Sequence, residues 1–206
     1  MKTDCFSILD LMLHTASRVE ETARLVDQDE AARFLDEVIS AKRIYVVGAG
    51  RSGLVAKAFA MRLMHLGFES YVVGETITPA FTGGDLLAAF SGSGETKSVV
   101  ETCEIAHDLG GRIALVTATP ESSIGRIADT VVTLGENHLR RPDVPHDFEV
   151  RQLTGQYRSA SATATTPAET IFETAALVFA DAIVAALMEV RHCTLDEIKG
   201  RWANVQ

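Results

Sequence analysis

The chain has 206 residues, of which 47% are hydrophobic and 23% are charged, as is typical of one soluble globular domain. Its formal net charge of −9 argues against non-specific binding to nucleic acid or to an anionic membrane surface. The three cysteines, Cys5, Cys103 and Cys193, are too few and too far apart to indicate a disulfide framework or a metal site. No signal-peptide layout and no apolar run long enough to span a membrane is recognised, so we expect a cytoplasmic protein.

Helical and strand patterns alternate along most of the chain. Residues 1–42 have apolar positions at helical spacing. Strands are then predicted over 43–47, 71–73, 86–90, 112–116 and 130–134, and helices over 54–66, from Thr96 to Leu109, and over 123–128. Such alternation predicts an α/β fold with a single doubly wound, five-stranded parallel sheet and helices on both faces.

The C-terminal third departs from this alternation. Residues 135–166 show no sustained period, which is typical of a functional or mobile loop. A long apolar helix is predicted over 168–190, and Thr194 begins a capping-box pattern that predicts one more short helix. We therefore expect one domain over 1–206, with N-terminal helices (1–42), a sheet core (43–134), an irregular loop (135–166) and C-terminal helices (167–206).

One glycine-serine loop, Ser91-Gly92-Ser93-Gly94-Glu95-Thr96, follows the buried strand 86–90 and opens a helix. Glycines let the backbone approach a ligand closely, and the first amides of a helix attract anions. The loop therefore favours a phosphate site, and the alternative is an ordinary strand-to-helix turn capped by Ser93 or Thr96.

A second loop of the same kind, Gly48-Ala49-Gly50-Arg51-Ser52-Gly53, follows the strand 43–47. It also matches the dinucleotide pattern G-x-G-x-x-G, with Glu75 placed where a ribose-binding carboxylate would stand. The loop at 91–96 is a second phosphate cradle that a dinucleotide fold does not need, and little chain remains for a substrate domain. A nicotinamide-dependent oxidoreductase is therefore the weaker alternative.

With these motifs in view, the sequence resembles the sugar isomerase (SIS) domain family, and within it the 6-phospho-3-hexuloisomerases. The resemblance covers nearly the whole chain and is carried by the two loops and by three further stretches, namely Ala60–Phe68, Val73–Pro79 and Phe172-Glu173.

The resemblance implies interconversion of 3-hexulose 6-phosphate and fructose 6-phosphate through an enediol, in the ribulose monophosphate pathway of formaldehyde assimilation. It implies a sugar-phosphate substrate, no metal or organic cofactor, and a homodimer or homotetramer. Two departures stand out. The loop 135–166 is longer than usual, and Trp202 stands where relatives commonly carry histidine.

The expected catalytic base is Glu173, because a single carboxylate can carry one proton between neighbouring carbons. Its neighbours Ile171, Phe172 and Ala175 are apolar and could remove water from the carboxylate. From the residues alone, a solvated glutamate that complements the helix dipole is the more common outcome, and it is the resemblance that favours the catalytic role. Glu169, one turn earlier, is the rival base.

The second expected catalytic residue is His65, which could move hydroxyl protons. It lies thirteen positions beyond Ser52, so at about 1.5 Å per residue it stands roughly 20 Å down the same helix. It therefore acts in a neighbouring subunit's site or is a structural helix-end histidine. Arg51 either lies over the phosphate or is solvated.

The expected substrate-binding residues are Gly50, Arg51 and Ser52 in the first loop, and Ser91, Gly92, Ser93, Gly94, Glu95 and Thr96 in the second. Two other functions remain open for these residues: an isomerase of a different sugar phosphate, and a non-catalytic sugar-phosphate sensor on the same domain. The apolar helices at both ends of the chain favour at least a dimer.

Overall fold

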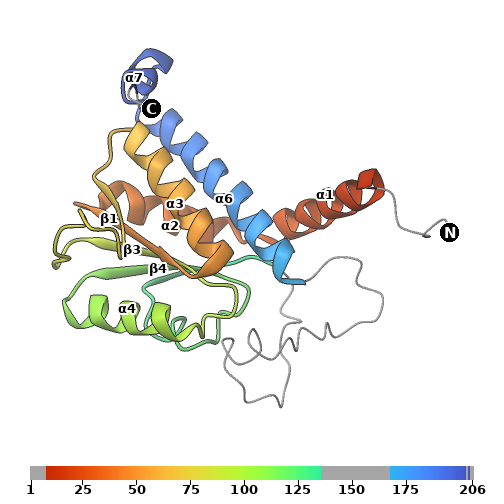
Figure 1. Ribbon diagram of the computed structural model, residues 1–206, viewed down its shortest axis with the longest axis horizontal. Coiled ribbons are helices and arrows are strands. Elements are labelled where there is room, and N and C mark those ends of the chain that lie inside the picture. The colour runs from red at the N-terminus through yellow and green to blue at the C-terminus, as the bar shows by residue number, and fades with distance from the viewer. Residues whose placement is uncertain (1–7, 136–167, 203, 205–206) are drawn as a thin grey trace.

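The computed structural model of the chain describes residues 8–135, 168–202 and 204, with 168–170 described by their backbone alone. Within these ranges five parallel strands form one sheet in the order β2-β1-β3-β4-β5 (Figure 1). The strands are β1 (Ile44–Gly48), β2 (Ser70–Val72), β3 (Leu86–Phe90), β4 (Arg112–Thr117) and β5 (Thr130–Thr133). The predicted doubly wound α/β sheet is thus confirmed. Its strand order reverses between β1 and β3, the position where open α/β sheets bind ligands.

Helices cover both faces of the sheet, as Figure 1 shows, with α4 below it and α2, α3 and α6 above it. The described helices are α1 (Ile8–Leu25), α2 (Gln28–Ser40), α3 (Gly50–His65), α4 (Lys97–Asp108), α6 (Ala168–Val190) and α7 (Leu195–Lys199). Successive strand side chains point to opposite faces. Ile44 and Val46 therefore lie in the core with α2, α3 and α6, whereas Tyr45 lies in the core with α4.

Helix α3 begins at Gly50, four residues earlier than the sequence predicted. The Gly50–Gly53 part of the loop is the first turn of this helix, which packs tightly against the end of β1. A Cβ atom on Gly53 would lie 2.7 Å from the carbonyl oxygen of Gly48, and one on Gly48 would lie 2.8 Å from the carbonyl carbon of Ser52. Glycine is therefore required at both positions, and this close contact outweighs its low helix propensity.

The helix predicted over 123–128 is wrong, because the structure has a series of turns there. The amides of Ile127 and Ala128 both donate to the carbonyl of Ile124, at 3.0 Å each, and no regular helix follows. Ile124 itself is fully buried in the core with α4. A segment this short, with Gly125 in its middle, has low helix propensity. The burial of Ile124 holds it in place instead.

The expectation that no apolar run is long enough to span a membrane is wrong for helix α6. Residues Ile171–Val190 are long and apolar enough to cross a bilayer by length and composition, and no other such helix occurs in the described parts of the chain. In this protein the apolar composition of α6 is explained by burial, because one face of the helix supplies much of the protein core. The buried side chains on that face include Phe172, Ala176, Phe179, Ile183 and Leu187.

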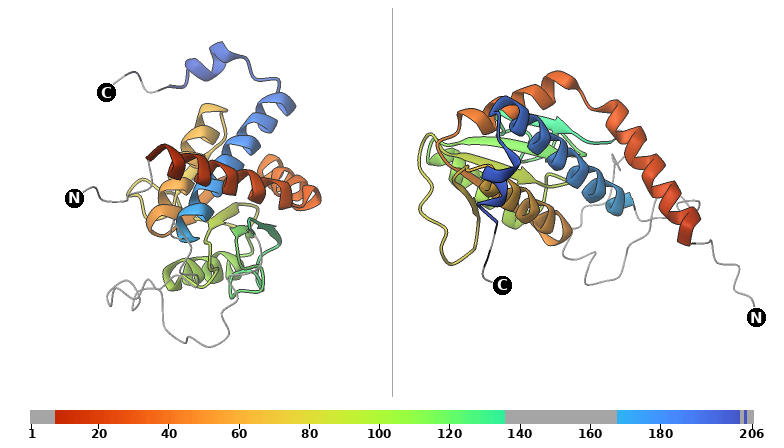
Figure 2. Two further views of the ribbon diagram at one scale, coloured as in Figure 1. Left: turned by 90° about the vertical axis from the view of Figure 1, so that its right-hand side faces the viewer. Right: turned by 90° about the horizontal axis from the view of Figure 1, so that it is seen from above.

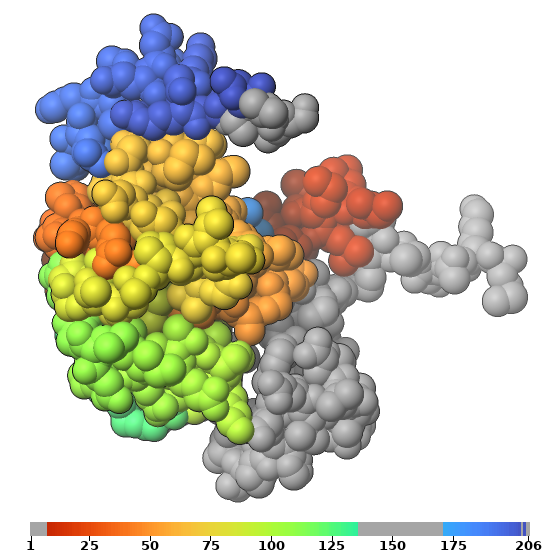
Figure 3. All heavy atoms as spheres, turned by 60° about the vertical axis from the view of Figure 1, so that its left-hand side comes forward, coloured from red at the N-terminus to blue at the C-terminus, as the bar shows by residue number. Residues whose placement is uncertain are grey.

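Helix α1 crosses α6 and projects away from the sheet (Figures 2 and 3). One side of α1 packs on α6, whereas Ile8 is 79% exposed and Met12 is 65% exposed. The N-terminal region is helical as predicted from residue 8 to residue 40, with a break at Val26-Asp27. Residues 1–7 and most of the predicted loop 135–166 lie outside the described residues.

Candidate active site

The two glycine-serine loops leave the sheet side by side. Gly48, the last residue of β1, is in register with Phe90, the last residue of β3. The chain continues from these two residues into the loops at 49–53 and 91–96, at the carboxyl edge of the sheet. Both loops therefore flank the point at which the strand order reverses.

The beginning of α6 contacts both loops. The hydroxyl of Ser52 donates a hydrogen bond to Oε1 of Glu173 at 3.3 Å, and Nε of Arg51 lies 3.6 Å from Oε2. On the other side, a Cβ atom on Gly92 would lie only 2.9 Å from the ring of Phe172. The Phe172-Glu173 pair thus sits between the loops, and the structure brings the predicted base together with Arg51 and Ser52.

The three polar side chains on this side of the site differ in burial. Ser52 is 7% exposed, and the side chain of Glu173 is 14% exposed. The Arg51 side chain is 58% exposed and is the cation nearest to the carboxylate in the described structure. A largely buried carboxylate therefore lies beside an exposed positive charge, an arrangement suited to both proton transfer and anion binding.

Within the loop at 91–96 the hydroxyl groups are used differently. The buried Ser91 accepts a hydrogen bond from the amide of Gly94 at 3.2 Å and so holds the turn closed. The exposed Ser93 accepts from the amide of Glu95 at 3.2 Å. Thr96 is the N-cap residue of α4, yet its side chain makes no capping hydrogen bond. The Ser93 and Thr96 hydroxyl groups thus lie at the start of α4, where the sequence predicts a phosphate site.

The carboxylate of Glu95 binds the segment that follows β4. It accepts hydrogen bonds from the amide and the hydroxyl of Ser123, both at 2.7 Å. The carbonyl of Gly92 accepts from the hydroxyls of Thr117 and Thr119, at 3.2 and 3.3 Å. The end of β4 and the segment after it thus hold the loop in place. Sequence reasoning missed these contacts, although Thr117 ends a strand at the same edge of the sheet.

His65 stands at the far end of α3, so the structure does not bring it to Glu173 of the same chain. Burial, and then the charge of Arg62, lowers the pKa of the imidazole below its ordinary value. The carbonyl of His65 accepts from Nη1 of Arg201 at 3.4 Å. The ring of Trp202 lies 6.3 Å from the imidazole, centroid to centroid.

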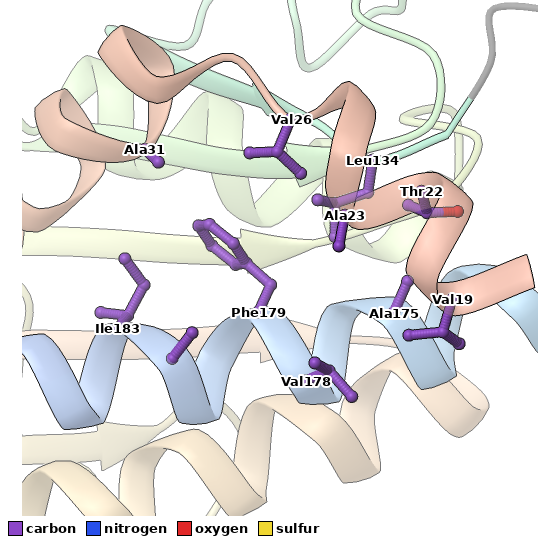
Figure 4. Close-up of a pocket in the computed structure, with 11 residues that line it drawn as sticks. Val19, Thr22, Ala23, Val26, Ala31, Leu134, Ala175, Val178, Phe179 and Ile183 are labelled. Carbon is purple, nitrogen blue, oxygen red and sulfur yellow. The ribbon is translucent and has the colours of Figure 1, made fainter. Parts of the chain in front are cut away.

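An apolar cavity of about 280 Å³ lies elsewhere, between α1, α2 and α6 (Figure 4). Val19, Val26, Leu134, Val178, Phe179 and Ile183 are among the side chains that line it. The hydroxyl of Thr22, the one side-chain polar group among the lining residues, donates to the carbonyl of Arg18 at 3.0 Å. The cavity offers a phosphate no donor, so we place the candidate site at the loops.

Two observations bear on metals and cofactors. No group of three or more His, Cys, Asp or Glu side chains that could hold a metal ion occurs among the described residues. The carboxylate of Glu75, considered above as a ribose ligand, accepts from Nζ of Lys57 on α3 at 2.6 Å. Of the predicted site residues, the rival base Glu169 has a side chain outside the described structure.

Comparisons with known proteins agree with the fold. The SIS domain family model matches residues 37–138. A 3-hexulose-6-phosphate isomerase of Bacillus subtilis is 38% identical over 92% of this chain and 94% of its own length. The isomerase of the same name from Mycobacterium gastri is 35% identical over 91% and 86%.

A crystal structure of a Methanococcus jannaschii protein, from which the function of 3-hexulose-6-phosphate isomerase was inferred, superimposes with a TM-score of 0.73. It is 30% identical and covers 98% of this chain and 100% of that one. The chain therefore belongs to the SIS domain family, in the group that includes the 3-hexulose-6-phosphate isomerases.

Proposed function

We propose that the protein is a 6-phospho-3-hexuloisomerase, which interconverts 3-hexulose 6-phosphate and fructose 6-phosphate. The observation that carries this proposal is the Glu173 carboxylate held by Ser52 and Arg51 between two glycine-serine loops. The names of the Bacillus subtilis and Mycobacterium gastri relatives support the same reaction. The ribulose monophosphate pathway is the metabolic setting in which this reaction is used.

The substrate phosphate binds in the space between the loops. Ser93, Thr96 and the first amides of α4 supply hydrogen-bond donors, and the positive end of the helix dipole points the same way. The exposed guanidinium of Arg51 lies close enough to contact the phosphate or the sugar. These local donors are needed because the whole chain carries a net charge of −9.

The sugar lies against Glu173, which carries one proton between neighbouring carbons. In 3-hexulose 6-phosphate the carbonyl is at C3, and the carboxylate removes the proton from C2 to give an enediolate. It then returns this proton to C3, while the oxygen-bound proton moves from O2 to O3, so that the carbonyl ends at C2 and nothing is gained or lost. Ser52 and Arg51 orient the base through their contacts to its two oxygens.

His65 moves the oxygen-bound proton in the site of a neighbouring copy of the chain. The exposed face of α3 carries an apolar stripe, in which Leu54 is 68% exposed, Met61 50% and Met64 40%. If two α3 helices pair antiparallel about position 59, Leu54 of one copy faces Met64 of the other. The same pairing sets His65 of one copy opposite Gly53 of the other, next to Ser52 and Glu173.

The assembly is a homotetramer in this proposal. The stripe on α3 is one apolar surface, and the projecting helix α1, with Ile8, Leu9, Met12 and Leu13 exposed, is another. Two different self-complementary surfaces on one chain generate a closed tetramer with two kinds of interface. We further propose that the whole chain forms one domain and acts in the cytoplasm, where sugar phosphates are metabolised.

The test is solvent exchange into fructose 6-phosphate in deuterated water, followed by proton NMR. The proposed reaction, run backwards, removes the proton from C3, so we expect deuterium at C3 and none at C1. Exchange at C1 instead would assign an isomerase that works between C1 and C2. Tight binding of fructose 6-phosphate with no exchange would identify a sugar-phosphate sensor.

A further inference from the structure

The segment that follows α6 is fixed onto the far end of α3. Helix α7 begins with a complete capping box between Thr194 and Glu197, and its Ile198 is 8% exposed and joins the core. Arg201 continues this contact. Its guanidinium would lie 3.2 Å from a Cβ atom on Gly67, and its Nη1 donates to the carbonyl oxygens of His65 and Glu197, at 3.4 and 3.3 Å.

This anchoring places Trp202 beside the imidazole of His65. The two rings lie 6.3 Å apart, centroid to centroid, at an interplanar angle of 54°. Trp202 is still 53% exposed, so it lies at the surface beside the imidazole and does not belong to the core.

We propose that Trp202 is the positioning residue of His65: the indole packs against the imidazole, fixes its orientation at the end of α3 and keeps water from one side of it. The inference rests on the proposed function, in which His65 moves an oxygen-bound proton in the site of a neighbouring copy. For that task the imidazole must point out of its own chain in one orientation.

The electrostatic surroundings of His65 agree with this role. The charge of Arg62 on α3 acts on the imidazole, Arg201 donates to the backbone carbonyl of His65, and Asp181 on α6 lies 3.9 Å from Nε of Arg62. Burial and then the charge of Arg62 lower the pKa of His65 below its ordinary value, which favours the neutral imidazole. A neutral imidazole has one donor nitrogen and one acceptor nitrogen, as a shuttle between two hydroxyl oxygens requires. An indole can cover the ring without adding charge.

The test compares Trp202→Ala with Trp202→Phe in the full-length protein. His65 is titrated by NMR through its ring C–H signals, which are assigned by their loss in His65→Gln. We expect Trp202→Ala to raise the pKa of His65 towards its ordinary value, because water then reaches the ring, and Trp202→Phe to leave it near the parent value. Both variants should melt within a few degrees of the parent, because Trp202 is half exposed.

Measurements of kcat and its pH dependence separate this role from a purely structural one, because a purely structural role of Trp202 would leave both unchanged. In Trp202→Ala we expect kcat to fall about tenfold with an unchanged KM, and the acid limb of the kcat profile to move to higher pH. Trp202→Phe should restore both. An unchanged His65 titration in Trp202→Ala, or a changed titration with a normal kcat, overturns the proposal.

The NMR titration of His65 needs no substrate. The proposed isomerase function and the proposed role of Trp202 can therefore fail separately. A parent protein that exchanges no proton of fructose 6-phosphate contradicts the proposed function, whereas the NMR comparison still decides whether Trp202 controls the imidazole. Should Trp202→Ala fold poorly, Trp202→Leu keeps the apolar bulk and loses the ring, and the same expectations apply to it in weaker form.

Discussion

The Ser52 hydroxyl donates a hydrogen bond to the Glu173 carboxylate at 3.3 Å, although 121 positions separate the two residues in the chain. Ser52 lies in the first turn of α3 and Glu173 in the second turn of α6. These two helices pack along each other on the same face of the sheet. A carboxylate is thereby held at the edge where both glycine-serine loops end.

The first prediction concerns Glu173→Gln. Glutamine keeps the shape and the hydrogen bond from Ser52 but cannot accept a proton from carbon. We expect kcat to fall by a factor of about 10²–10⁴, with little change in the affinity for sugar phosphate. Steady-state kinetics and equilibrium binding of fructose 6-phosphate measure the two effects.

The matched control for that variant is Glu169→Gln, one helical turn earlier on α6. It removes the same charge near the same helix end, and the rate should stay within a factor of about three of the parent. Normal turnover of Glu173→Gln together with an inactive Glu169→Gln would move the base by one turn. Activity in both variants would exclude both carboxylates.

The fold was readable from the sequence because each local signal agreed with the sheet. The run Leu86–Phe90 is apolar throughout, and the structure buries all five residues in β3 between two helical layers. The start of α3 was misplaced because Gly50–Gly53 has low helix propensity, and the close contact of Gly48 with Gly53 becomes visible only in three dimensions.

The sequence predicted which segments form the candidate site, but not which side chains contact one another there. Periodicity and glycine spacing identify both loops, since each directly follows a strand. No local pattern reports that Glu95 binds Ser123, or that Phe172 packs on Gly92, because those pairs are set by the crossing of distant elements. The roles of Glu173, His65 and the loop residues therefore remain predictions that the variants must test.

The second prediction concerns the phosphate. Ser93→Ala and Thr96→Ala each remove a hydroxyl group at the start of α4, and each should weaken sugar-phosphate binding by about 1–3 kcal/mol. We expect KM to rise and kcat to change little. Thr102→Ala is the control, because its hydroxyl donates to the carbonyl of Ser98 on the same helix, one turn further along. Unchanged affinity in both loop variants would exclude this loop as the phosphate site.

The third prediction concerns stability at the other edge of the sheet. Burial alone would raise the pKa of the Asp85 carboxyl, but hydrogen bonds from Arg43 and from the amide and hydroxyl of Thr82 outweigh burial, so the pKa lies below its ordinary value. The charged form therefore stabilises the fold above the unfolded pKa, and this stabilisation is lost as the pH falls through the folded pKa.

Asp85→Asn should consequently lower the melting temperature at neutral pH by about 5 °C or more, and the difference from the parent should shrink as the solution is acidified. Glu75→Gln is the comparison, because the Lys57–Glu75 pair is exposed, with side chains 54% and 52% accessible. Its melting temperature should change by less than about 2 °C. A constant difference between Asp85→Asn and the parent at every pH would contradict the assignment.

The last prediction tests whether neighbouring copies share a site. Glu173→Gln lacks the base, and His65→Gln lacks the hydroxyl shuttle, so each homo-oligomer should be strongly impaired. In a mixed pair, the chain with intact Glu173 can receive the intact His65 of its neighbour. One functional site then forms in each mixed pair.

Random mixing in equal amounts makes about half of the pairs mixed, and each of these has one of its two sites intact. We therefore expect about a quarter of the parent activity to return when the two variants are unfolded together and refolded. Separately refolded variants, combined only in the assay, serve as the control and should stay inactive. If co-refolding restores nothing, Glu173 and His65 do not act across a subunit boundary. The antiparallel pairing of α3 would then be wrong, because it is this pairing that sets His65 of one copy beside Ser52 of the other.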